Sequence, residues 1–226
     1  MFDKFIDRID KQIINKSLLD HTFYQEWQSG SLNLDDLKVY AKQYYHFESN
    51  FPRFLSAIHA RCHDPEVRQV VLENLWDEEH GEGNHRELWL DFCAGLGLSR
   101  TEVIDSVPYA NTLALVNDYY EVCSNGSFLE GLASIYAYES QLPEVSTQKM
   151  EGLVKWYGIS DSTSLEFFRI HAYLDLEHSQ SESRLISKHT SYNIEHAVNQ
   201  AIQVGLDAWY SFLDGINELR RNLVRT

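Results

Sequence analysis

The sequence predicts an all-α fold, on the strength of three observations. Apolar residues recur every three or four positions along most of the 226-residue chain, which is the period of an amphipathic helix. Strand-like alternation of apolar and polar residues is scarce, and only four prolines and 11 glycines interrupt the helical pattern. We therefore expect residues 1–226 to form a single domain, a bundle of eight or nine helices built around an internal site.

Three helices are predicted in the N-terminal part of the chain. A short amphipathic helix comes first, and a second covers about residues 18–27 and ends at a turn at Gly30. Asn33 can cap the third helix, because its side-chain oxygen can accept hydrogen bonds from the first free backbone N–H groups. That helix is expected to reach about Cys62 with a kink at Pro52, since proline removes one backbone hydrogen bond. The apolar stripe of the first helix consists of Phe2, Phe5, Ile6 and Ile9.

Capping residues mark the later helices. Asp64 followed by Pro65 is a typical helix start. The helix that follows is expected to reach about Gly95, although Gly81 and Gly83 weaken its middle. Further helices are expected from the capping box of Ser99 and Glu102, and at about residues 109–124, 127–141, 143–157, 162–188 and 191–223.

The acidic balance of the chain narrows the classes of partner. Nineteen lysines and arginines against 34 aspartates and glutamates give a net charge of −15 at pH 7. Such a surface repels phosphate backbones and anionic lipids, so we expect neither nucleic acid nor a membrane as a partner. Multivalent cations are the favoured ligands.

The N-terminal residues and the cysteines indicate a cytoplasmic protein. Charged residues interrupt the first ten positions, which therefore lack the apolar core of a signal peptide. No later run approaches the ~20 apolar residues of a membrane span. The three cysteines, Cys62, Cys93 and Cys123, form no even framework of disulfide pairs, so we expect reduced thiols.

The strongest sign of chemistry is the set formed by His171, Asp175 and His178. On a helix that advances about 100° per residue, Asp175 lies about 40° and His178 about 20° from His171. Three potential metal ligands therefore project from one face in adjacent turns. Apolar neighbours on the same stretch predict that this face is turned inward.

Two other segments add matching donors. Glu78 and His85 are seven residues apart and share one helix face if the helix continues through the intervening glycines. Glu139 follows a run of apolar and aromatic residues, where an ionised carboxylate is costly without a cation. Six nitrogen and oxygen donors suit two metal ions with a bridging carboxylate, and this donor chemistry favours iron or manganese. The spacing is not the Glu-x-x-His repeat of ferritin-like di-iron bundles.

Several stretches outside these donors are also distinctive. They are HTFYQEW at 21–27, YAKQYY at 40–45, FP at 51–52, LSAIHARC at 55–62, NLWDEEHGEGNH at 74–85 and YAYESQLP at 136–143. Together they resemble the chlamydial proteins that associate with death domains, a family of haem-oxygenase-like dimetal oxidases. Its wider superfamily includes thiaminase II and the oxidase of coenzyme PQQ synthesis. The similarity runs in register over about residues 3–215 and implies a haem-oxygenase-like seven-helix bundle with short extra helices.

The resemblance also implies a cofactor and an activity. It places a dinuclear Fe/Fe or Mn/Fe centre on the six donors described above, with dioxygen and an external reductant as cosubstrates. The implied reaction is oxygen-dependent synthesis of p-aminobenzoate for folate, with the protein itself as substrate. The aromatic ring would derive from Tyr24 and the amino group from Lys149, while Tyr40 and Tyr138 match further tyrosines near the centre.

The sequence departs from the family pattern in two places, in the charges that follow Pro143, near Lys149, and at the C-terminal end. Lys149 lies ten residues after Glu139, and a turn beyond Pro143 would bring it back toward the centre. There, burial and nearby cations would favour its neutral, nucleophilic amine. The cysteine-rich tail of the chlamydial proteins has no counterpart in this sequence, so death-domain binding is not expected.

Other functions stay open at this point. The same fold and metals could serve a dissociable small-molecule substrate in place of the protein's own side chains. A metal-free, thiaminase-like hydrolase would need a cysteine nucleophile, but none of the three cysteines has an evident base. A non-enzymatic interaction protein would bind no metal and expose an apolar surface. A homodimer is expected by analogy with the fold alone, and the sequence does not identify the electron donor.

Overall fold

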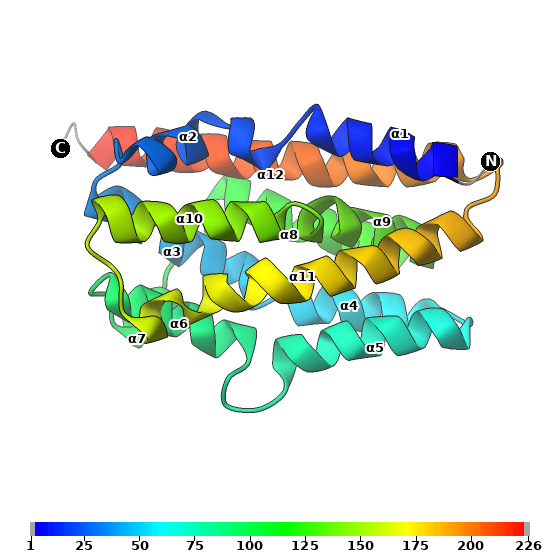
Figure 1. The fold of residues 1–226 in the computed structure, drawn as a ribbon, viewed down its shortest axis with the longest axis horizontal. Coiled ribbons are helices and arrows are strands. Elements are labelled where there is room, and N and C mark those ends of the chain that lie inside the picture. Colours follow the sequence, from blue (N-terminus) through cyan, green and yellow to red (C-terminus); the bar gives the residue numbers. More distant parts are fainter. Residues whose placement is uncertain (1–2, 224–226) are drawn as a thin grey trace.

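The computed structural model describes residues 3–223, in which helices run mostly along one long axis and no strand occurs (Figure 1). The predicted all-α fold is therefore confirmed. The described residues form twelve α-helices and one 3-10 helix, more than the expected eight or nine, because three predicted helices are each divided. The elements are α1 (Asp3–Ile14), η1 (Leu18–Asp20), α2 (Thr22–Ser29), α3 (Leu34–Glu48), α4 (Phe51–Arg61), α5 (Pro65–Glu79), α6 (His85–Gly95), α7 (Arg100–Ile104), α8 (Ala110–Asn125), α9 (Phe128–Glu139), α10 (Leu142–Trp156), α11 (Ser162–His189) and α12 (Glu195–Leu223).

The N-terminal stripe and the second helix differ in detail from the prediction. Phe2 lies outside the described residues, whereas Phe5 and Ile9 are buried as expected. The predicted helix at 18–27 is divided into η1 and α2, because His21 has an extended backbone and its ring nitrogen caps α2 by accepting a hydrogen bond from the N–H of Phe23. Gly30, in the left-handed conformation, ends α2 as predicted.

The long helix predicted around Pro52 is two helices rather than one kinked helix. α3 begins at the expected capping box, in which Asn33 and Asp36 satisfy each other's backbone N–H groups. It ends at Glu48, because Pro52 has no N–H with which to continue the hydrogen bonding to that carbonyl. Pro52 instead lies in the first turn of α4, where a missing N–H costs nothing.

The helix predicted from Asp64 to Gly95 is also interrupted. Asp64 caps α5 as expected, but residues 80–84 form a loop that projects from the bundle (Figure 1). His80 is extended and Gly81 has a φ of 82°, so neither can continue an α-helix. Asn84 then caps α6. Glu78 and His85 consequently belong to different helices, and the expected shared helix face does not exist.

The remaining helices match the predicted segments closely, and α11 and α12 are the longest. α11 crosses the bundle and packs against α6, α9 and α10, while α12 packs against α8 and α9. The buried apolar side chains form one continuous core, with Cys62, Cys93 and Cys123 as free buried thiols. In residues 3–223, the helices are either too short or too polar to cross a lipid bilayer.

The close approach of α9 to α4 gives a test of this packing. A β-carbon at Gly131 would lie 2.7 Å from a side-chain carbon of Ile58, so we expect Gly131→Ala to lower the free energy of unfolding by about 1–3 kcal/mol. Urea denaturation measures the change. Gly83→Ala is the matched control, because no atom lies within 4 Å of its added β-carbon. Equal stability of the two variants would contradict this arrangement of α4 and α9.

Candidate metal centre

The six predicted ligands converge inside the bundle from α5, α6, α9 and α11. Three of them, Glu139, Asp175 and His178, place one donor atom each within 4.8 Å of one another. His85 and His171 belong to a second group with the same spacing. Glu78 adjoins this second group, with its Oε1 2.8 Å from Nδ1 of His85. Helices that are separate in the sequence therefore supply donors to one buried region.

The second group contains a carboxylate that the sequence analysis missed. Glu48, the last residue of α3, completes the trio with His85 and His171. The two imidazole rings lie 4.5 Å apart, centroid to centroid. Nδ1 of His171 lies 2.6 Å from the carbonyl oxygen of Phe167, which fixes the ring and leaves Nε2 free as a donor.

Neighbouring polar groups hold the first group in place. The side-chain amide of Asn74 donates hydrogen bonds to both oxygens of Glu139, at 2.9 and 3.1 Å. Nε2 of His178 lies 3.0 Å from a carboxylate oxygen of Asp77, which leaves Nδ1 directed toward Asp175. Such outer contacts orient metal-binding side chains and set their tautomers.

Unsatisfied buried atoms are concentrated around these groups, and this pattern fits bound cations. Buried polar atoms normally have hydrogen-bond partners, because an unpartnered one costs free energy. Here most of the exceptions in the described chain face one region, as expected of atoms that would coordinate metal ions. They are Glu48 Oε1, Asn74 Oδ1, Glu78 Oε2, His85 Nδ1, Asp175 Oδ2, His178 Nδ1 and Glu182 Oε2.

The pKa shifts of the donors support the same conclusion. Burial raises the pKa of the Glu48 carboxyl to about 8 and that of Glu78 well above its usual range, the latter with help from the nearby charge of Glu139. Burial also lowers the pKa of His85 and, with repulsion from His85, that of His171. The imidazoles of His85 and His171 are therefore neutral, which is the form that binds metals, and the carboxylates need cations to stay ionised. At His178 the effect of burial is outweighed by the neighbouring carboxylates, which raise its pKa to about 10, so a metal ion bound there would displace a proton.

A second buried cluster joins the predicted tyrosines to Lys149. The hydroxyl of Tyr40 lies 3.0 Å from that of Tyr24 and accepts a hydrogen bond from Nζ of Lys149 at 2.8 Å. The Lys149 amine is 4.7 Å from the centroid of the Tyr24 ring. Tyr138 hydrogen-bonds to Tyr44, another residue that the sequence analysis did not single out.

The route by which Lys149 reaches this cluster differs from the prediction. Ser140 and Gln141 keep right-handed helical backbone angles, so the chain does not turn back after Glu139. α10 instead extends beyond α9 along the long axis (Figure 1). Lys149 reaches the interior because it lies on the inward face of α10, and only 5% of its surface is exposed.

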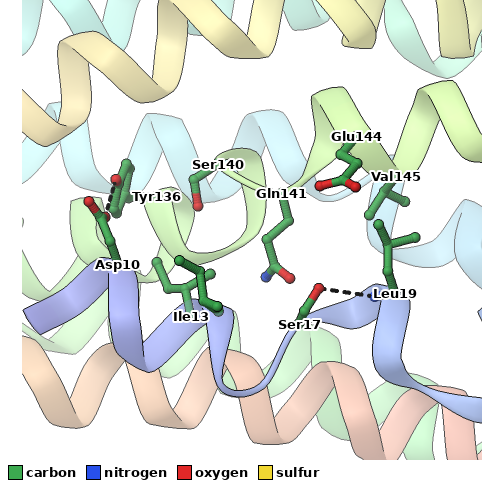
Figure 2. A pocket seen from close by; sticks show the side chains of 10 residues that line it. Asp10, Ile13, Ser17, Leu19, Tyr136, Ser140, Gln141, Glu144 and Val145 are labelled. Carbon is green, nitrogen blue, oxygen red and sulfur yellow. Dashed lines mark hydrogen bonds between the residues drawn. The ribbon is translucent and has the colours of Figure 1, made fainter. Parts of the chain in front are cut away.

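Two cavities lie near α9, and only the smaller one borders the donor cluster. The larger, of about 380 Å³, lies between α1 and the junction of α9 with α10, and none of the six predicted ligands lines it. Figure 2 shows Ser140 and Gln141 directed into it and Tyr136 bonded to Asp10. The smaller, of about 160 Å³, is lined by His178 together with Asn74, Asp77 and Glu182, and so borders the donors directly.

The residues that sequence reasoning missed carried usable signals. Glu182 is four residues after His178 and so extends the same face of α11 by one turn. Glu48 follows Tyr40 and Tyr44 at intervals of four, a carboxylate on an otherwise aromatic face like that of Glu139. Asp77 offered no such signal, because its role depends on the approach of α11 to α5.

The cysteines do not suit a metal-free hydrolytic mechanism. Burial raises the pKa of both Cys93 and Cys123 to about 12, which disfavours the nucleophilic thiolate. Burial also raises the pKa of Cys62, whose Sγ faces the backbone carbonyl of Asp64 rather than a base. The thiaminase-like alternative therefore has no support among these residues.

Comparison of the sequence with known proteins identifies a family of redox enzymes and several similar synthases. The sequence pattern of a family described as iron-containing redox enzymes matches residues 38–210. A 4-aminobenzoate synthase of Chlamydia trachomatis is 37% identical over 214 residues, which cover 95% of this chain and 92% of the relative. A 4-aminobenzoate synthase of Nitrosomonas europaea is 38% identical over 224 residues, with 95% and 91% covered.

Solved structures share the fold at low sequence identity. A domain with a haem-oxygenase-like fold from Shewanella denitrificans has a TM-score of 0.82 and 16% identity, covering 98% of this chain and 94% of that one. A CADD-like protein of Nostoc punctiforme has a TM-score of 0.76 and 18% identity, with 94% and 97% covered. The haem-oxygenase-like fold predicted from the sequence is thus confirmed.

Metal uptake tests the donor cluster. We expect the protein to bind about two transition-metal ions per chain when loaded under reducing conditions. Glu139→Ala and His171→Ala should each abolish stoichiometric loading, because each removes one donor from a different trio. Elemental analysis measures the ratio, and Glu144→Ala, at an exposed glutamate on α10, is the control. Full loading of both donor variants would show that the metals bind elsewhere.

Lys149 should make folding stability depend on pH. Burial lowers its pKa from 10.5 to about 7, so between these values the unfolded chain binds the proton and the folded chain does not. The free energy of unfolding should therefore fall as the pH decreases from 10.5 to 7, by at most about 1.4 kcal/mol per pH unit. Below pH 7 this contribution should level off. Lys149→Met removes the group while keeping the apolar stem.

The measurement is the difference in unfolding free energy between wild type and Lys149→Met across that pH range. Taking the difference cancels the titration of the other buried groups. A difference that stays constant from pH 7 to 10.5 would show that Lys149 remains charged in the folded protein.

Proposed function

The chain belongs to the family of iron-containing redox enzymes, and we propose that it is an oxygen-dependent oxidoreductase that makes 4-aminobenzoate from its own side chains. Relatives named 4-aminobenzoate synthase are 36–38% identical over most of the chain. Tyr24 supplies the aromatic ring and Lys149 the amino group. The product is p-aminobenzoate, the precursor that folate synthesis needs.

The carbon skeleton of the product is consistent with a tyrosine source. 4-Aminobenzoate contains a benzene ring with one further carbon, and a tyrosine ring with its Cβ has the same seven carbons. The hydroxyl of tyrosine is para to Cβ, just as the amine of the product is para to the carboxylate. Tyr24 would therefore lose its Cα–Cβ bond, and dioxygen would oxidise Cβ to the carboxylate. The Lys149 nitrogen would replace the phenol oxygen, which leaves as water, and the bond of that nitrogen to Cε of Lys149 would break.

The position of Lys149 is the observation that carries the proposal. Its amine lies over the face of the Tyr24 ring at 4.7 Å and is bonded to Tyr40, which in turn is bonded to Tyr24. Because burial lowers the pKa of Lys149 to about 7, a large fraction of the amine is neutral and nucleophilic near neutral pH.

The metal centre provides what the side chains lack. An Fe/Fe or Mn/Fe pair held by the six predicted ligands would supply, with dioxygen and an external reductant, the oxidising power to break a carbon–carbon bond. The fold holds the reacting groups together. The Tyr40 hydroxyl accepts a hydrogen bond from the Lys149 amine and is hydrogen-bonded to the Tyr24 hydroxyl, which aligns the two groups. Aromatic side chains around Tyr40 exclude water from the cluster: the ring of Phe23 stacks on that of Tyr40, and the ring of Trp27 packs edge-on against it.

A dissociable substrate is less well supported. Tyr24 is 2% exposed and Tyr40 fully buried, so the space between the metal centre and Lys149 is filled by the chain's own side chains. The 380 Å³ cavity lies on another side of the α9–α10 junction, away from the predicted ligands.

Free cysteines suit a reducing cytoplasm, where we place the protein, and we retain a homodimer as a proposal from the fold.

The proposal is tested by exposing reduced, metal-loaded protein to dioxygen. We expect release of 4-aminobenzoate at no more than about one molecule per chain, as a single turnover requires. Intact mass spectrometry should show a matching loss from the chain, which peptide mapping should locate at Tyr24 for the ring and at Lys149 for the nitrogen. Tyr24→Phe should suppress the release, because the phenol oxygen is the group that nitrogen replaces.

Tyr119→Phe is the matched control, since Tyr119 is also fully buried but bonds to Ser134 and Trp209 rather than to Lys149. Sustained release of many product molecules per chain, with no loss of mass, would instead establish a dissociable substrate.

A further inference from the structure

The predicted ligands are divided unevenly between the two donor groups. Glu139, Asp175 and His178 give one metal ion three terminal donors. The other group contains only two of the six, His85 and His171, with Glu78 in contact with His85. The third donor of this closely spaced group is therefore not one of the six predicted ligands.

Glu48 is placed to fill this position. A carboxylate oxygen of Glu48 lies within 4.8 Å of a donor nitrogen of both His85 and His171. Glu48 is 4% exposed, and its Oε1 has no hydrogen-bond partner. No ion pair within residues 3–223 includes Glu48, so its charge is not compensated by a neighbouring arginine or lysine. A carboxyl group buried in this way stays ionised only beside a cation.

We propose that Glu48 is a seventh protein ligand, which completes a two-histidine, one-carboxylate site for one of the two metal ions. Two imidazoles and one carboxylate on one face, with the remaining positions open, form the donor set of non-haem iron oxygenases. The proposal rests on the dinuclear centre proposed above and assigns to it a residue outside the six predicted ligands. Each of the two ions would then have three protein donors from one closely spaced trio.

The position of Glu48 on α3 gives this coordination a structural consequence. Tyr40, Tyr44 and Glu48 lie at successive intervals of four on one face of the helix. Tyr40 bonds to the Lys149 amine, and the Tyr44 ring packs 5.6 Å from that of Tyr40. Binding of Glu48 to the metal would fix the end of the helix that positions these tyrosines, so metal loading and alignment of Tyr24 are coupled through α3.

Glu48 has one competing role, as a distant counter-ion for Lys149. Its charge acts to raise the pKa of the Lys149 amine, but no contact between the two residues is formed. The two roles predict different behaviour. A counter-ion can be neutralised or shortened without affecting metal affinity, whereas a ligand cannot.

Anaerobic titration of the metal-free, full-length protein with cobalt(II), followed by visible absorption, separates these roles. We expect two binding steps in the wild type, one of which His171→Ala removes. Glu48→Gln keeps the size of the side chain and should weaken that same step by at least about tenfold while leaving the other step unchanged. Glu48→Asp keeps the charge but shortens the reach, and should weaken the same step.

Asp36→Asn is the matched control, because Asp36 is also a buried carboxylate on α3 but lies at the start of the helix and belongs to neither donor trio. It should leave the histidine-side step unchanged, and far-ultraviolet circular dichroism checks that each variant is folded. Two normal steps in both Glu48 variants would overturn the proposal while leaving the dinuclear centre intact. Equal weakening by Glu48→Gln and Asp36→Asn would also overturn it, in favour of a general charge effect. Absence of any cobalt binding by the wild type would overturn the centre itself.

Discussion

The burial of ionisable groups at the centre of the bundle is the constraint on which the rest of the structure depends. Carboxylates and imidazoles gather there with donor atoms that no other protein group satisfies. An isolated charge in a low-dielectric interior is strongly destabilised, so these groups weaken the metal-free fold. Transition-metal ions reverse that effect, because the free energy of metal binding also contributes to folding. Metal binding at these residues would therefore be coupled to the free energy of folding.

α3 connects the metal donors to the reacting side chains. Its inward face carries Tyr40 and Tyr44 toward Lys149, and its last residue, Glu48, toward the histidines. Pro52 ends the helix at this point, since it cannot donate the next backbone hydrogen bond. The proline for which the sequence predicts only a kink thus ends the helix and sets the position of the Glu48 carboxylate. Burial in the same interior lowers the pKa of Lys149 to about 7, which favours the neutral amine that the proposed reaction needs.

Much of the fold and most of the site could be predicted from local signals. Helix starts at Asn33 and Asp64 follow from capping chemistry, which involves residues only a few positions apart. The donors on α11 follow from helical spacing alone. The pairing of Glu78 with His85 was predicted for the wrong reason, because the helix stops between them and the two residues meet across a loop. Helical spacing can identify a shared face only while the helix continues.

The sequence by itself determined the fold class, the all-helical core and the types of donor available, since periodicity, capping and composition act over short distances along the chain. Only the tertiary structure decided which donors share a site. Glu48 joins the two histidines, and Asp77 orients His178, because helices distant in the sequence pack together. Lys149 likewise reaches Tyr24 through the packing of α10 rather than through a turn. Contacts between helices depend on the shape of every interface, and no local pattern records that.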